Sequence, residues 1–443
     1  MTFRQITPAK GLRSDLIITV LPVVWASSKL VPAKVTALGL AALVVLAFLR
    51  KSDVRHPVQT GPLMLLFASF AIVFVRPQPN FIALTFLTLV GTLILILVSR
   101  VDGRVFIGSF IDGWGLFLLV NVLAHAAGIR AAQAPGVVRQ TTDFVRITFP
   151  LTSGWNSPAI IAGAYLVAAI FLIREGGWLK RSLRLAYAAS AILIFIGTGT
   201  RGALVVSIVL AAVAIWLPTA GRWIGQATTL VAATSALVLP TVIAWIAFVV
   251  QPLTALTPGR GRITSTEAIT TLQGRVEIWD GSITYWKVWV KEVPEMLLGF
   301  GPNGQYTSGA SLTYKAVVAG LRSDPEYSTL HNAFLQQVFD GGIVGWLLLL
   351  IAVYWASTRL SDRRGAWGPW ALSAIFALTS LLLGSMTESQ MAPGVLQESF
   401  WMLFGLVGIA CQVSTEETGS TRVTKTAATA TEQMPTSSRI AEV

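Results

Sequence analysis

Three polar residues lie where apolar runs of the chain meet polar stretches, and their side chains could carry chemistry. Arg201 lies in the turn Gly-Thr-Gly-Thr-Arg-Gly-Ala, at 197–203, between two apolar runs. An arginine so placed is costly without an anionic partner, so we predict that Arg201 binds an anion. Arg275 lies in a long polar stretch, and His331 opens another apolar run. Because imidazole exchanges protons near neutral pH, His331 is a candidate general base.

Each of these residues also has a structural interpretation. Arg201 could be a residue that sets membrane topology, although such residues gather on the cytoplasmic side. Arg275 follows Gly274 and could be a surface residue or pair with Glu277 or Asp280. His331 could cap its helix or contact lipid headgroups. The local sequence leaves both interpretations open for all three.

Three acids and one glycine motif add further candidates. We interpret Asp340, just before Gly341-Gly342, as structural, and Glu388 and Glu398 as acids that could join a site on the outer face. A G-x-G-x-x-G pattern occurs at 299–304, but no strand-turn-helix context surrounds it. We therefore interpret its glycines as a flexible turn that returns the chain to the membrane, not as a dinucleotide site.

The elements that must position these residues are set by the composition of the chain. Of 443 residues, 54% are hydrophobic and 12% are charged, and the mean hydropathy is +0.68. Ordinary soluble chains contain about 25% charged residues, so this composition excludes a water-soluble enzyme. The single cysteine, Cys411, excludes internal disulfides, and three histidines make a histidine-rich metal cluster improbable.

The apolar runs predict an all-α, polytopic membrane protein with about twelve spanning helices of roughly 20 residues each. These runs fall near 15–31, 33–49, 61–76, 80–98, 106–129, 157–173, 184–198, 202–218, 223–250, 331–356, 367–385 and 392–412. With both termini on one side, 16 lysines and arginines lie in the short segments of that side, excluding the C-terminal tail. Seven lie in the opposite short loops: Lys29, Lys34, Arg76, Arg130, Arg139, Arg146 and Arg201. The positive-inside rule therefore predicts cytoplasmic termini, and explains the net charge of +12 without a nucleic-acid partner.

The chain divides into four predicted parts. Residues 1–250 carry helices one to nine, and 251–330 form an extracytoplasmic loop domain. Residues 331–412 carry helices ten to twelve, and the Ser/Thr-rich segment 413–443 is a disordered cytoplasmic tail. Within the loop, Trp279, Ile283, Trp286 and Val290 recur at helical spacing. This pattern predicts an amphipathic helix that lies on the membrane surface or packs on the helix bundle.

Three fragments, taken in order, resemble the O-antigen ligase and polymerase superfamily. They are the Thr-Gly-Thr-Arg-Gly-Ala turn, Gly-Arg-x-x-x-Trp at 274–279, and His331-Asn332 followed by Gly341-Gly342-x-x-Gly345. The resemblance covers about 197–350. Members of that superfamily are polytopic glycosyltransferases of the GT-C kind, and Thr200 stands where a serine is often found.

The resemblance implies a reaction on the outer face of the cytoplasmic membrane. A glycan moves from an undecaprenyl diphosphate carrier to a hydroxyl of a glycan or lipid-core acceptor, with inversion and without metal or cofactor. Arg201 and Arg275 would bind the diphosphate, since guanidinium groups bind phosphate oxygens bidentately. His331 would take the proton of the acceptor hydroxyl, with Asn332 and Thr200 in support.

Two other classes of function compete with this one. A polysaccharide or lipid transporter would need polar groups across the whole membrane, whereas these gather at one face, and no internal repeat is visible. A structural membrane protein would not explain Arg201. Within the superfamily, the sequence does not separate a ligase from a polymerase or from an enzyme that glycosylates protein.

Overall fold

The computed structural model describes residues 14–49, 56–130, 147–154, 156–254, 274–318, 325–393 and 397–413. The regular elements of this part of the chain are helices, apart from an isolated bridge between Val58 and Gln412. The all-α prediction is therefore confirmed for the described ranges. The tail predicted at 413–443 falls outside them beyond Val413.

Each of the twelve predicted spans coincides with a helix. These helices are α1 (Ser14–Ala26), α2 (Ala33–Leu49), α3 (Gly61–Val75), α4 (Phe81–Arg100), α5 (Gly103–Ala126), α6 (Asn156–Leu172), α7 (Trp178–Thr198), α8 (Arg201–Trp216), α9 (Ile224–Thr254), α15 (Ala333–Asp362), α17 (Pro369–Ser385) and α18 (Glu398–Ala410). Three of them, α4, α5 and α15, are long and apolar enough to cross a membrane, and others are shorter apolar helices. The number of crossings stays a prediction.

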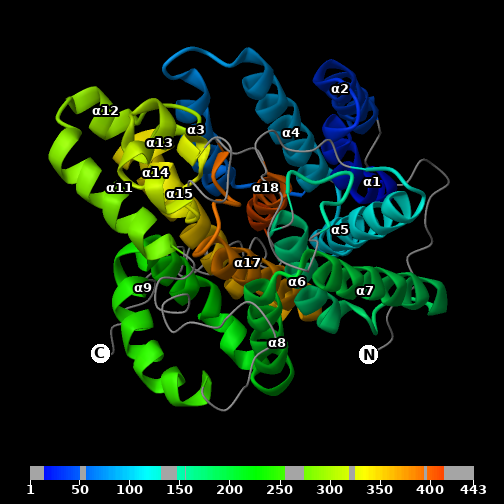
Figure 1. Ribbon diagram of the computed structural model, residues 1–443. Helices are drawn as coiled ribbons and strands as arrows, with labels where there is room; N and C mark the ends of the chain where they lie inside the picture. Colours follow the sequence, from blue (N-terminus) through cyan, green and yellow to red (C-terminus); the bar gives the residue numbers. More distant parts are fainter. Residues whose placement is uncertain are drawn as a thin grey trace, which may run out of the picture.

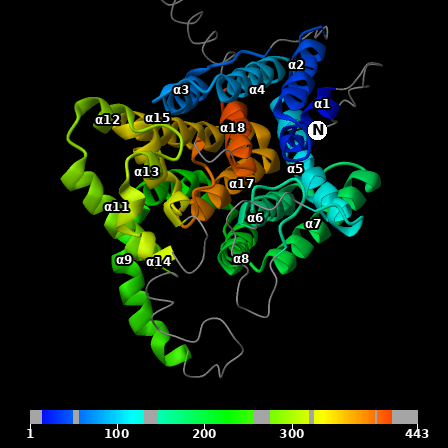
Figure 2. The same cartoon turned by 45° about the horizontal axis from the view of Figure 1, so that its top comes forward.

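The centre of the bundle is formed by α6, α17 and α18 (Figures 1 and 2). Helix α17 packs most extensively against α6, α15 packs against α3 and α9, and α1 packs against α5. Every residue of α18 is buried, so this short helix is enclosed by its neighbours. Elements far apart in the sequence therefore meet around the start of α6 and α18.

The outward faces of the peripheral helices are apolar. Leu38 and Phe48 of α2, Ile196 of α7 and Val205 and Ile208 of α8 are all more than half exposed. Soluble monomers rarely expose continuous apolar surface on this scale, because it is unfavourable in water. These faces are what a lipid environment requires, and they fit the membrane protein that the composition predicts.

The loop between α9 and α15 contains short helices around one longer helix, α11 (Arg275–Trp289). The shorter ones are α12 (Val293–Leu298), α13 (Gly304–Thr307), η3 (Ala310–Thr313), α14 (Lys315–Val318) and η4 (Pro325–Tyr327). In Figure 1 this group lies together at the upper left, beside α15. Trp279 is fully buried, and the ring of Trp286 packs edge-on against Phe339 of α15. The inner face of α11 thus packs on the bundle, which was one of the two predicted arrangements.

The glycine motif at 299–304 forms a turn, as its sequence suggested, but backbone contacts hold that turn in place. The amides of Phe300 and Gly301 donate to the carbonyls of Phe339 and Asp340 at 2.8 and 2.9 Å. A Cβ atom on Gly304 would collide with the backbone of Phe339. The glycines are needed because two backbones touch here, and this contact fastens the loop to α15 beside its kink at Gly342.

Asp340 completes this attachment. Its Oδ1 atom accepts from the backbone amide of Gly304 at 2.8 Å and from the side chain of Gln336 at 2.7 Å. Gln336 in turn donates to Gln305 at 2.6 Å. These contacts are consistent with the structural role expected for Asp340, and they hold the loop rigidly against the start of α15.

Candidate functional site

Glu388 lies at the centre of the candidate site, on the segment that follows α17. One carboxylate oxygen accepts from the guanidinium of Arg275, and the other lies 3.0 Å from Nδ1 of His331. The side chain of Glu388 is 9% exposed, whereas those of Arg275 and His331 are 20% and 24% exposed. A buried acid thus contacts two partly exposed side chains, Arg275 and His331, that lie 56 residues apart in the sequence.

The surroundings of Glu388 keep it ionised. Burial raises the pKa of its carboxyl group, but the charges of Arg275 and His331 and hydrogen bonds from His331 and Asn156 outweigh burial and lower that pKa to about 2. An ionised carboxylate only accepts hydrogen bonds, so Nδ1 of His331 must donate to it. In neutral His331 the lone pair then lies on Nε2, which is the arrangement of a base oriented by an acid.

The backbone holds His331 in an uncommon conformation. Its φ of 51° lies in the left-handed region, which few residues other than glycine adopt. The residue before it, Leu330, donates to Gln336 at 3.1 Å and accepts from the indole of Trp279 at 2.8 Å. Such a conformation persists only where neighbouring contacts determine it, as they do here on α11 and α15.

Asn332 fixes the chain on the other side of His331. Its carbonyl oxygen accepts from the amide of Leu335 at 2.9 Å and so caps the N-terminus of α15. Its amide donates to Ser235 of α9 at 2.7 Å and to the carbonyl of Met386 at 3.0 Å. The side chain expected to support His331 therefore connects α15 to α9 and to the segment that carries Glu388.

Arg275 is the first residue of α11, and Gly274 before it has a φ of 85°. Only glycine adopts this conformation readily, so Gly274 permits the turn from which the arginine emerges. The sequence left a surface position or an ion pair with Glu277 or Asp280 as alternatives for Arg275. The structure pairs Arg275 with Glu388, 113 positions along the chain.

The turn that contains Arg201 is connected to Glu388 through Asn156, the first residue of α6. Helix α7 ends at Thr198, Gly199 takes a left-handed φ of 61°, and α8 begins at Arg201. The hydroxyl of Thr200 donates to Asn156 at 3.3 Å, and Asn156 hydrogen-bonds Glu388. The backbone of Arg201 is thus one residue from this chain of contacts; its side chain lies outside the described part of the structure.

Residues 185–350 match the model of a family described as O-Antigen ligase. This match supports the resemblance of that segment to the O-antigen ligase and polymerase superfamily. No curated protein matches the chain. The matched segment contains Arg201, Arg275 and His331, whereas Asn156 and Glu388 lie outside it on either side.

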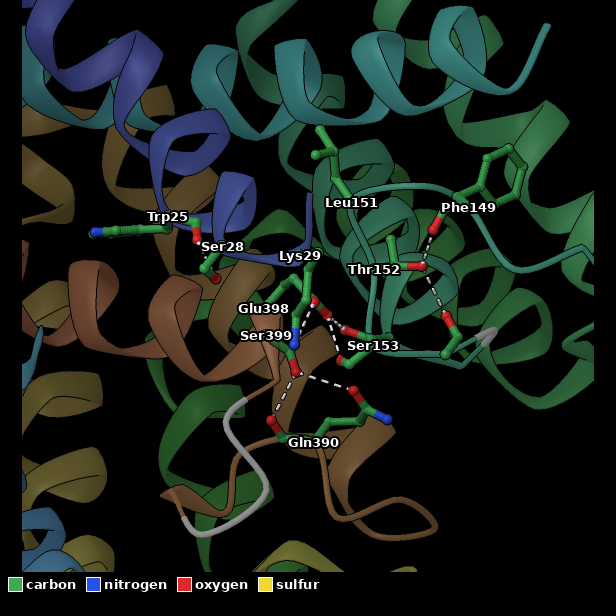
Figure 3. Close-up of polar contacts among 12 residues, drawn as sticks. Trp25, Ser28, Lys29, Phe149, Leu151, Thr152, Ser153, Gln390, Glu398 and Ser399 are labelled. Atoms are coloured by element: carbon green, nitrogen blue, oxygen red, sulfur yellow. Dashed lines mark hydrogen bonds and ion pairs between the residues drawn. The ribbon is translucent and has the colours of Figure 1, made fainter. Parts of the chain in front are cut away.

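A second buried acid, Glu398, lies close by in the sequence and has different partners. Its Oε2 atom accepts from Ser157 at 2.6 Å and from Ser153 at 2.9 Å, and its Oε1 atom lies 3.8 Å from the ammonium of Lys29. Figure 3 shows Lys29, Ser153 and Glu398 converging, with Ser399 bonded to Gln390 beside them. This cluster joins η1 (Ser27–Lys29), the start of α6 and α18.

Two residues of the site were not singled out from the sequence. Asn156 lies in a polar stretch just before an apolar run, and Ser235 follows Thr234 inside another, so neither stands out as a site residue. Glu388 was noted as an acid of the outer segment, but its partners could not be identified. Only the packing of α6, α9, α11 and α15 around that segment brings these groups together.

Proposed function

We propose that this protein transfers a glycan from an undecaprenyl-diphosphate-linked donor to an acceptor hydroxyl on the outer face of the cytoplasmic membrane. The observation that carries the proposal is the pairing of Glu388 with both Arg275 and His331. It combines a cation suited to phosphate with an oriented base, inside a chain that resembles the O-antigen ligase and polymerase superfamily. An O-antigen ligase and a surface polysaccharide polymerase would share this chemistry.

In the proposed step, the acceptor oxygen attacks the anomeric carbon of the donor sugar. The bond from that carbon to the diphosphate oxygen breaks, and the configuration inverts. The acceptor proton passes to Nε2 of His331, and the diphosphate leaves on its lipid carrier. A diphosphate leaving group needs no general acid, so the protein must mainly activate the nucleophile and stabilise developing negative charge.

Arg275 and Arg201 would bind the diphosphate in this scheme. A guanidinium has five N–H donors in a rigid fork, which matches the geometry of phosphate oxygens. Glu388 positions Arg275 and, through Nδ1, keeps His331 in the tautomer that can accept a proton. It also stabilises the imidazolium that forms. Asn332 and Thr200 hold the neighbouring backbone and Asn156.

The proposal includes a membrane topology. Both termini lie in the cytoplasm, and the site faces outward, where nucleotide sugars are absent and a preassembled lipid-linked donor supplies the glycan. Neither a metal ion nor a cofactor takes part, and the acceptor is a glycan or a lipid core. The exposed apolar faces of α2, α7 and α8 support the placement in a bilayer.

Substitution at the base tests the proposal. His331→Ala in proteoliposomes should lower the turnover of glycan transfer by about 10²–10⁴-fold, the usual contribution of a general base. Arg275→Lys keeps the charge but loses the fork, and should lower turnover by about 100-fold. Transfer is measured as glycan moved from the lipid-linked donor to the acceptor, and Trp178→Ala, at the exposed start of α7, is the control.

Two outcomes would contradict the proposal. Normal transfer by a His331→Ala protein that inserts correctly into the membrane would show that His331 is not the general base. Movement of the lipid-linked glycan across the bilayer, with no transfer by wild type, would point to a transporter instead.

A further inference from the structure

The loop domain contains a cavity that the proposed transfer chemistry does not use. Its volume is about 460 Å³, and it is lined by Tyr306, Thr307, Gly309, Ser311, Leu312 and Glu326. This volume lies within the usual range of small-molecule sites, roughly 300–1,000 Å³. The lining residues combine an aromatic ring, hydroxyl groups and one carboxylate, with neither lysine nor arginine among them.

One wall of the cavity is built on a pair of stacked tyrosines. The rings of Tyr306 and Tyr327 lie 4.0 Å apart between centroids, at 23° to each other. Tyr306 is 39% exposed and Tyr327 is 48% exposed, so the pair is not enclosed by the fold. A tyrosine ring has an apolar face and a polar tip, and stacking restrains its orientation. This is a surface suited to the C–H face of a sugar ring.

The polar groups of the cavity complement sugar hydroxyls. The Oγ atom of Ser311 is buried and has no hydrogen-bond partner within the described ranges, although such groups are normally paired. Glu326 is one-third exposed and pairs with Lys315 at 3.0 Å. A sugar hydroxyl entering the cavity could donate to the carboxylate of Glu326, which is open to solvent. The lining itself offers a carboxylate and no cation, and Lys315 is already paired with that carboxylate, so the neutral part of a glycan fits better than the diphosphate.

The cavity is held rigidly at a distance from the Glu388 site. The hydroxyl of Tyr285, on α11, donates to the carbonyl of Ser308, and that of Tyr314 donates to Ser328 at 2.9 Å. Tyr285 lies ten residues after Arg275 on the same helix, which corresponds to about 15 Å. The cavity is thus too far away to hold the transferred bond, but it is on a path that a chain of sugars could follow.

A second cavity extends this path. Its volume is about 340 Å³, and Thr307 lines both cavities. Its other lining residues include Tyr285, Trp289, Arg76 and Glu295, again aromatic rings beside polar groups. Two adjoining cavities suit an extended ligand better than a single small molecule.

We infer that the cavity around Tyr306 is a second glycan-binding site, which holds sugar units of the substrate remote from the bond being made. The inference rests on the proposed function, because it takes the ligand to be the polymeric part of the transferred or accepting glycan. It assigns the loop domain a role in selecting long chains, in addition to presenting Arg275.

Direct binding tests this site. The probe is surface polysaccharide of the source cell, released by mild acid and separated into short and long fractions. The full chain in lipid nanodiscs should bind the long fraction more tightly. Tyr306→Ala should weaken that binding by about tenfold, since it removes one aromatic contact, and Tyr306→Phe should stay within about twofold. Glu326→Gln provides a second variant that retains the side-chain volume, and should weaken binding by several-fold.

Transfer assays separate this inference from the proposed function. Tyr306→Ala should raise KM for a long-chain substrate and leave kcat unchanged, whereas Trp178→Ala should leave both unchanged. If wild type does not bind the long fraction, or if Tyr306→Ala and Glu326→Gln bind it like wild type, the inference is wrong. If His331→Ala transfers normally, the proposed function fails, whatever Tyr306 does.

Discussion

Glu388 and Glu398 are both buried acids between α17 and the first turn of α18, but their surroundings differ. Glu388 contacts a guanidinium and an imidazole, both partly open to solvent. Glu398 contacts two serine hydroxyls and lies 3.8 Å from a lysine ammonium. The adjacent residues Asn156 and Ser157, at the start of α6, contact one acid each.

The difference shows that burial alone does not distinguish a reactive acid from a structural one. Groups that can exchange protons or bind an anion surround Glu388. The serines around Glu398 neither titrate nor carry charge, and they connect α6 to α18. We therefore expect Glu388 to affect turnover and Glu398 to affect stability.

The largest expected effect is that of Glu388→Gln on turnover. The amide can no longer stabilise imidazolium at His331 and can hold the ring in the wrong tautomer, so transfer should fall by about 1,000-fold. The measurement is the initial rate of glycan transfer at saturating donor. Glu398→Gln, the matched change ten residues later, should retain at least half of the wild-type rate.

Glu388→Asp adds a check on folding, because it keeps the charge and shortens the side chain. Its rate should lie between those of wild type and Glu388→Gln. Equal rates for Glu388→Gln and Glu398→Gln would eliminate the distinction between the two acids.

The second effect concerns acid stability. The pKa of Glu388 falls from 4.5 to about 2 on folding, so its ionised form stabilises the folded state at neutral pH. This contribution is about 3 kcal/mol; it is fully present above about pH 4.5 and is lost as the pH falls toward 2. At pH 3.5 roughly half of this stabilisation is lost. The difference between the thermal unfolding midpoints of wild type and Glu388→Gln should therefore shrink as the pH falls from 6 to 3.5. A constant difference would contradict the assigned pKa.

The sequence predicts the helices of this protein better than it predicts the contacts of the candidate site. The helices were predictable because apolar runs of spanning length leave few alternatives, and α1 to α9 begin and end near the predicted residues. Arg275 and His331 were recognisable from their fragments. Their connection through Glu388 was not, because an ion pair across 113 positions depends on packing, which leaves no local pattern.

The glycine motif at 299–304 was visible in the sequence, but its structural role was not. The residues at 299–304 were identified as glycine-rich, but whether such glycines give freedom or close approach depends on what lies opposite. Here the backbone of α15 lies opposite, at Phe339 and Asp340. The local sequence of the segment does not identify that packing partner.

The third effect is the loss of stability in Glu398→Gln. Both serines donate to Oε2, which the amide oxygen can replace, but hydrogen bonds to a neutral oxygen are weaker than those to a carboxylate, at a cost of about 1–2 kcal/mol. The unfolding midpoint should fall while the transfer rate stays near that of wild type. A lower rate with an unchanged midpoint would mean that Glu398 belongs to the reaction.

The smallest effect is that of Lys29→Met. Lys29 is 32% exposed and lies 3.8 Å from Glu398, so solvent screens the pair and its contribution should be below about 1 kcal/mol. A double-mutant cycle with Glu398→Gln measures this term directly, because it separates the pair from the weakening of the serine contacts. A coupling well above that value would show that Lys29 matters as much to Glu398 as Arg275 does to Glu388. The two acids would then differ in the identity of their cations, and the partly open imidazole would be the feature that makes one of them reactive.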